Sequence, residues 1–163
     1  MQNINLEDYK GVYVFAQQVD NELSSIAFEL LGEAGRLAKP LNTEVTAVLL
    51  GSNVGNLVDQ LAEYGADKVI VVDDPELETY RTEPYAHALA EVINKYKPEI
   101  MLVGATAIGR DLGPILEQNI VHHLFGEFLV LDASVFDEWV DIIPVFLVIL
   151  ADRFTLPETV ATY

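Results

Sequence analysis

Residues 99–114 read EIMLVGATAIGRDLGP and join an apolar run to a turn that contains glycine and arginine. A buried β-strand is predicted over Glu99 to Val103, because the apolar run here is short, continuous and bounded by polar and glycine residues. In a parallel α/β sheet, ligands bind at the carboxyl ends of the strands. The stretch therefore predicts a fold in which a buried strand delivers the segment 104–114 to the functional edge of a sheet.

Working outward, three more apolar runs precede this one, and helical periodicity separates them. Strands are expected at 11–16, 44–50 and 68–72. A first helix over 26–38 is expected to begin at the Ser24-Ser25 cap and to end near Pro40. A short helix capped by Asn56 is expected to end at Gly65, and a third is expected to run from Thr82 and Pro84 to Pro98.

The strands are apolar at consecutive positions rather than at alternate ones, which indicates helices on both faces of the sheet. Strands alternating with helices then give a doubly wound, mostly parallel sheet. The predicted fold class is α/β, a Rossmann-like three-layer sandwich of the adenine-nucleotide alpha-hydrolase-like kind. All 163 residues are expected to form one domain.

The composition changes after Pro114. Residues 115–163 hold one base, Arg153, against eight acids, whereas residues 1–114 hold eight bases against eighteen. A helix is expected over 115–124, with further strands at 127–131 and 145–150. We treat 115–163 as an atypical C-terminal part of the same domain.

The overall charge excludes some classes of function. The formal net charge of −17 repels phosphate backbones and anionic lipid surfaces, so no nucleic-acid partner is expected. The absence of cysteine excludes disulfides and thiolate chemistry. The longest apolar run, 142–151, is too short to span a bilayer, so no membrane insertion is expected. The N-terminal residues lack a secretory pattern, and a cytoplasmic location is expected.

The candidate binding residues are Gly104, Thr106, Gly109 and Arg110. Glycine after a strand lets the backbone approach a ligand, a following helix offers N–H groups to an anion, and arginine adds charge and bidentate hydrogen bonds. These features are typical of a phosphate or nucleotide loop, but they are equally compatible with a turn that binds nothing. No Gly-Lys-Ser or Gly-Lys-Thr of a P-loop occurs in the chain.

Other chemistry has weak support. His122 and His123 are adjacent and would diverge on a helix, and Glu127 is off their helical face, so no metal site is expected. The acids Asp132 to Asp141 are best interpreted as a solvated surface. No serine lies in a nucleophile elbow. The sequence thus offers no catalytic constellation, so an enzyme is not favoured.

The string GATAIGRDLGP at 104–114 resembles the signature of electron transfer flavoprotein α subunits. Other segments resemble that family in the same order, and the resemblance covers about residues 6–114. These segments are Tyr9–Ala16, Glu29–Gly32, Thr46–Gly51, Tyr64–Val69 and Lys97–Ile100.

The resemblance implies the N-terminal domain of an α subunit, in a heterodimer that relays electrons from dehydrogenases. In this family FAD is held mainly by a second domain of the α subunit, which is expected to be absent here. FAD is thus expected at the level of the complex and not on this chain alone. The first domain is expected to pack against the β subunit, whose related domain holds AMP or a second flavin. Ile115 to His123 depart from the family's pattern.

Three hypotheses remain open from the sequence. In the first, the chain is a scaffold in an electron transfer flavoprotein, without chemistry of its own. It could instead be a small AMP- or ATP-binding module that uses the four candidate residues. The composition step at residue 115 also fits a remodelled or designed α/β fold without a ligand. If the surface that faces the β subunit were left uncovered, its apolar residues would favour self-association.

Overall fold

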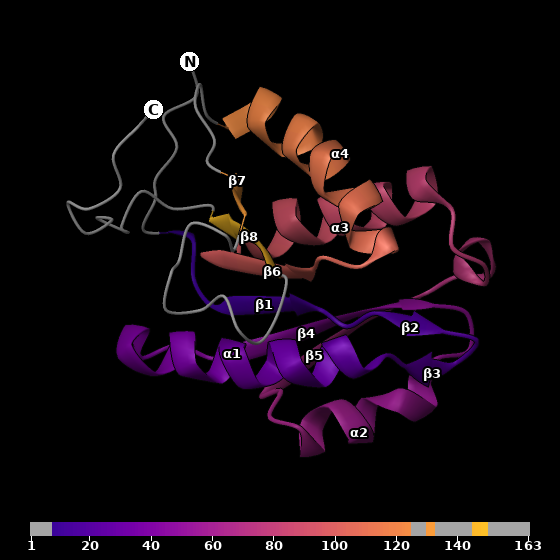
Figure 1. Cartoon of the computed structure of the whole chain (residues 1–163), viewed down its shortest axis with the longest axis horizontal. Coiled ribbons are helices and arrows are strands. Elements are labelled where there is room, and N and C mark those ends of the chain that lie inside the picture. The colour runs from indigo at the N-terminus through magenta and orange to yellow at the C-terminus, as the bar shows by residue number, and fades with distance from the viewer. Residues whose placement is uncertain (1–7, 125–129, 133–144, 150–163) are drawn as a thin grey trace.

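The computed structural model describes residues 8–124, 130–132 and 145–149, and these form a three-layer α/β structure. Figure 1 shows a central sheet with α1 and α2 on one side and α3 and α4 on the other. The helices are α1 (Ser25–Leu41), α2 (Val58–Glu63), α3 (Thr82–Tyr96) and α4 (Ala107–Leu124). The predicted Rossmann-like sandwich is confirmed.

The main sheet has the strand order β5-β4-β1-β6-β8-β7. Its strands are β1 (Val12–Phe15), β4 (Val45–Gly51), β5 (Lys68–Asp73), β6 (Ile100–Gly104), β7 (Val130–Asp132) and β8 (Val145–Ile149). The first four are parallel, and β8 and β7 extend the sheet antiparallel beyond β6. The chain moves from β1 outward to β4 and β5, and then returns to place β6 on the other side of β1. The boundary between β1 and β6 is therefore the topological switch point of the sheet.

Strand β1 lies at the centre and is buried along its whole length. Val12 and Val14 pack in the cluster beneath α1 and α2, whereas Tyr13 and Phe15 pack in the cluster beneath α3 and α4. Because successive side chains point to opposite faces, both faces of a central strand must be apolar. This is the physical reason for the continuous apolar runs in the sequence.

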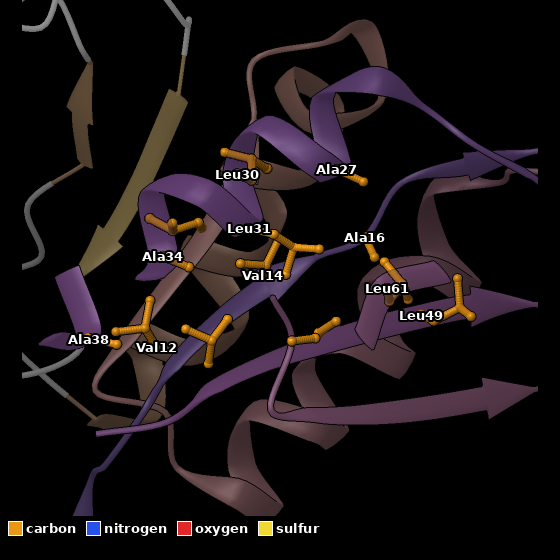
Figure 2. Packing of buried hydrophobic residues seen from close by; sticks show 14 of the residues in the cluster. Val12, Val14, Ala16, Ala27, Leu30, Leu31, Ala34, Ala38, Leu49 and Leu61 are labelled. Atoms are coloured by element: carbon orange, nitrogen blue, oxygen red, sulfur yellow. The ribbon is translucent and has the colours of Figure 1, made fainter. Parts of the chain in front are cut away.

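Helix α1 contacts the sheet through a stripe of leucine and alanine. Figure 2 shows this stripe facing Val12 and Val14 of β1. The small alanines let the helix backbone approach the strands closely, and the leucines fill the space between them. The buried residues of the helix are Ala27, Leu30, Leu31, Ala34 and Ala38.

The predicted end of the first helix near Pro40 is confirmed, whereas the predicted cap at Asn56 is wrong. Helix α1 continues past Pro40 to Leu41 and closes at Asn42, whose backbone is left-handed at φ 51°. A proline in the last turn removes one helical hydrogen bond but does not prevent the turn from forming. Asn56 does not cap a helix, because it lies inside the 3₁₀ turn η2 (Gly55–Leu57) that leads into α2.

The carboxylate of Asp73 organises the loop between β4 and α2. It accepts hydrogen bonds from the backbone N–H of Asn53 at 2.8 Å and from that of Val54 at 3.3 Å. A side chain at the end of β5 thus fixes the loop that precedes η2.

The sequence analysis missed a small hairpin directly after β1. It consists of β2 (Gln18–Val19) and β3 (Glu22–Leu23). The turn residues Asp20 and Asn21 have φ values of 52° and 60°. Both residue types tolerate the left-handed conformation that a two-residue hairpin turn requires.

The segment 104–114 also differs from the prediction. It was expected to be a loop followed by a helix from residue 115, but α4 begins at Ala107 and includes Pro114. In the C-terminal part, β8 matches the strand expected at 145–150, and β7 overlaps the one expected at 127–131. Residues 127–129, 133–144 and 150–163 lie outside the described part of the chain.

Among the helices that the structure describes, none is both long and apolar enough to cross a membrane.

The packing of α1 on β1 predicts the effect of truncating its central leucine. Leu30 has no exposed surface, so Leu30→Ala should lower the free energy of unfolding by about 2–5 kcal/mol. Glu29→Ala, on the exposed side of the same turn, should change it by less than about 0.5 kcal/mol. Urea unfolding followed by circular dichroism measures both variants, and equal losses would contradict this packing.

Candidate functional site

The candidate site lies at the switch point, where β1 and β6 end side by side. Gln17 follows β1, and only Ala105 and Thr106 connect β6 to α4. Strands β1 and β6 are paired in parallel, so their carboxyl ends meet at the same edge of the sheet. In open α/β sheets this position is a crevice that can receive a ligand.

The hydroxyl of Thr106 is the centre of this edge. It donates a hydrogen bond to Oε1 of Gln17 at 2.6 Å and accepts one from the backbone N–H of Gly109 at 3.1 Å. The carbonyl of Thr106 also accepts the N–H of Arg110 at 2.9 Å. Thr106 is therefore the N-cap of α4, and its side chain ties the start of that helix to the end of β1.

The cap explains why the predicted loop is helical. The threonine hydroxyl accepts a hydrogen bond from the N–H three residues further along the chain, and this satisfies one of the free donors of the first turn. Ala107 and Ile108 can then start the helix directly after the strand. Pro114 lies one turn beyond Arg110 and removes only the bond to that residue's carbonyl. Arg110 is thus a helical residue and not part of a loop.

Both candidate glycines have a packing requirement of their own. A Cβ on Gly109 would lie 1.8 Å from the carbonyl oxygen of Gly104, a distance that no side chain can tolerate. A Cβ on Gly104 would lie 2.5 Å from Cγ1 of Ile26 in α1. Glycine at these positions lets α4 and α1 pack closely on the end of β6. Their proposed role in ligand binding stays a prediction.

Arg110 is exposed in the first turn of α4 and makes no ion pair within the described residues. The structure therefore brings Gly104, Thr106 and Gly109 into mutual contact, while Arg110 lies one position beyond them on the surface. The nearest charged neighbour along the helix, Asp111, is engaged elsewhere.

The carboxylate of Asp111 joins α4 to the start of α3. It accepts a hydrogen bond from the hydroxyl of Tyr80 at 2.6 Å and another from the hydroxyl of Thr82. These bonds lower the pKa of Asp111 below its ordinary value. Burial, together with the Asp111 carboxylate, raises the pKa of Tyr80 to about 12.

The carboxyl edge of the sheet carries mainly negative charge. Asp20 and Glu22 are exposed on the hairpin after β1, and Asp73 and Asp74 are exposed at the end of β5. Carboxylates near a binding edge disfavour phosphate groups unless bases offset them. Two exposed arginines oppose them, Arg110 at the start of α4 and Arg81 at the start of α3.

Two residues that build this edge, Gln17 and Asp111, are not among the candidates predicted from the sequence. Gln17 and Thr106 are separated by 89 positions, so nothing in the local pattern indicates their contact. Asp111 lies within the segment 104–114 that carries the family resemblance, but its partners Tyr80 and Thr82 lie at the start of α3. Within the described residues no group of His, Asp or Glu could hold a metal ion.

Comparison with known proteins identifies what this domain is similar to. A sequence profile described as an electron transfer flavoprotein domain matches residues 12–117. Protein FixB of Clostridium saccharobutylicum is 46% identical over 132 residues, which is 81% of this chain and 39% of that protein. The electron transfer flavoprotein subunit alpha of Megasphaera elsdenii is 48% identical over 117 residues, or 72% of this chain and 35% of that protein.

A third relative is the acryloyl-CoA reductase electron transfer subunit beta of Anaerotignum propionicum. It is 43% identical over 110 residues, which cover 68% of this chain and 30% of that protein. The chain spans about two-fifths or less of the length of these curated relatives. The FixB alignment covers 132 residues of this chain, whereas only 114 residues lie between the N-terminus and Pro114. The alignment therefore continues past Pro114 into the C-terminal part of the chain.

The dual role of the Thr106 hydroxyl gives a prediction for stability. Thr106→Val removes both hydrogen bonds while keeping the shape, and should lower the free energy of unfolding by about 1–2 kcal/mol. Thr106→Ser keeps the hydroxyl and should remain close to the wild type. Thermal unfolding of the two variants tests this, and equal behaviour of valine and serine would show that the hydroxyl is not the cap.

The lowered pKa of Asp111 gives a prediction for pH dependence. The ionised carboxylate stabilises the fold above its ordinary pKa, and this contribution is lost as pH falls through the lower folded value. Asp111→Asn should therefore be less stable than the wild type at neutral pH, and the two should converge below about pH 4.

Urea midpoints measured across this range test the Asp111 prediction. Tyr80→Phe removes one donor to the carboxylate and should show part of the same convergence. A gap between Asp111→Asn and the wild type that stays constant down to about pH 2 would contradict the assignment.

Proposed function

The chain belongs to the electron transfer flavoprotein family, and on this premise we propose that it is the N-terminal α/β domain of an α-type subunit. Its role in the proposal is to provide the rigid scaffold on which a β-type subunit docks. The complete heterodimer would relay electrons from dehydrogenases through bound flavin. The observation that carries the proposal is the ordered match to α-type subunits across β1, β4, β5 and β6.

The geometry of the switch point supports a scaffold rather than a cofactor site. The segments that follow β1 and β6 are bridged by the hydrogen bond from Thr106 to Gln17. Two N–H groups of the first turn of α4, those of Gly109 and Arg110, already bind oxygen atoms of Thr106. A phosphate at this helix start would be left with the N–H groups of Ala107 and Ile108, in a field set mainly by carboxylates.

In this proposal FAD is associated with the complex, and the 163-residue chain alone binds none. The same geometry weighs against the hypothesis of an AMP- or ATP-binding module that uses Gly104, Thr106, Gly109 and Arg110. Two of those residues are glycines with a packing requirement, and a third is the helix cap.

Docking of the β-type subunit is expected to be specific rather than purely electrostatic. The acidic chain will attract any basic protein at low ionic strength, but this attraction is screened when salt is added. A packed interface between two α/β domains depends on buried apolar area and persists under the same conditions.

The proposal predicts two binding results. Sedimentation velocity should show a one-to-one complex of this chain with the β-type subunit from the same organism. The complex should survive about 0.5 M salt, where the Debye length falls to about 4 Å. Calorimetry of the chain alone with AMP, ATP and FAD should show no heat of binding.

A complex that dissociates on addition of salt, or no complex, would overturn the scaffold role. Saturable binding of AMP or ATP that Arg110→Ala abolishes would instead favour the nucleotide-binding module. Uptake of FAD by the isolated chain, visible as a flavin absorbance band, would contradict the placement of the flavin at the level of the complex.

A further inference from the structure

The strand β5 forms one edge of the main sheet, and its open side has no partner among the described residues. It pairs only with β4, along its whole length from Lys68 to Asp73. The sequence KVIVVD is rich in β-branched residues and has no proline or charge between its ends. An edge strand of this composition is a template for pairing with another strand.

The two faces of β5 are covered unequally. Ile70 and Val72 pack against the cluster beneath α3, and Val69 packs against the cluster beneath α1 and α2. Val71 belongs to neither cluster and is 38% exposed. Helix α2 is only six residues long, which leaves the outer part of this face without a covering helix.

We propose that β5 is the contact surface between two copies of this chain, paired antiparallel about a twofold axis that passes through Val71. The pairing would join the two sheets into one continuous sheet. It does not rest on the proposed electron transfer role.

Charge complementarity selects the second copy and its register. In a twofold antiparallel pair, directly opposite residues share a face, so the axis must pass through a residue. With Val71 at the axis, Lys68 of each copy lies opposite Asp74 of the other copy. The dimer therefore contains two such pairs. Asp74 continues the extended backbone of the strand, with φ −144° and ψ 137°.

The alternative register is electrostatically unfavourable. An axis through Ile70 places Asp67 of each copy opposite Asp73 of the other copy. This register contains two pairs of like charges and no pair of opposite charges. Like charges directly opposite destabilise a strand pair, whereas opposite charges stabilise it. The register through Val71 thus combines two favourable charge pairs with contact between the two exposed valines.

The charged ends of the strand are accessible for this pairing. The Lys68 side chain is 62% exposed, and its contact with Glu44 raises its pKa, which keeps it protonated. One oxygen of Asp74 accepts the N–H of Glu76 at 2.8 Å. A carboxylate has further lone pairs, so Asp74 can accept a second donor without losing this contact.

Sedimentation equilibrium of the purified chain tests the proposal first. The wild type should form a dimer, and Val71→Lys should abolish it, because two lysines would meet at the axis. Ala62→Lys adds the same charge on the exposed surface of α2, outside the paired strand, and should leave the dimer intact. A wild type that stays monomeric at all concentrations, or a dimer unchanged by Val71→Lys, would overturn the proposal.

A charge exchange tests the register. Lys68→Glu and Asp74→Lys should each raise the dissociation constant of the dimer roughly tenfold, because each places like charges opposite each other twice. The double variant restores opposite charges and should return to within about threefold of the wild type. A double variant no tighter than either single variant would overturn the register through Val71.

Folding of every variant is checked by circular dichroism, and a second measurement needs no variant. Amide hydrogen exchange in the wild type should slow at residues 69–73 as the protein concentration rises, while exchange in α2 should not change. Exchange at 69–73 that is independent of concentration would exclude β5 as the contact surface.

Discussion

The hydroxyl of Thr106 is the interaction on which the functional edge depends. One oxygen atom caps α4 by accepting the N–H of Gly109 and fastens that helix to β1 by donating to Gln17. Without it, the N–H of Gly109 in the first turn of α4 would lose its partner, and the hydrogen bond to β1 would be lost as well. The position where an open α/β sheet usually receives its ligand is thus occupied by the protein's own hydrogen bonds.

The glycines around this residue follow from the same constraint. Because α4 starts immediately after β6, Gly109 meets the carbonyl of Gly104, and only a residue without Cβ fits there. The four parallel strands could be predicted from sequence, since burial on two faces leaves a continuous apolar run. The helical state of residues 107–114 could not, because glycine and proline are typical of turns and the capping role of Thr106 depends on its conformation.

Contacts between distant parts of the chain could not be predicted from the sequence either. The pair of Gln17 with Thr106 and the pair of Tyr80 with Asp111 each join segments that only the folded sheet brings together. The string 104–114 that carries the family resemblance predicts a loop for a ligand, and that role stays a prediction. In the structure the same residues cap α4 and pack it closely on the end of β6.

A double-mutant cycle between Gln17 and Thr106 tests the closed switch point most directly. Gln17→Leu, Thr106→Val and the double variant are compared by their free energies of unfolding, alongside the wild type. If the two side chains are bonded across the ends of β1 and β6, the cycle should give a coupling energy of about 1 kcal/mol. Additive effects would mean that the edge is open, and the account of this domain as a scaffold would lose its physical basis.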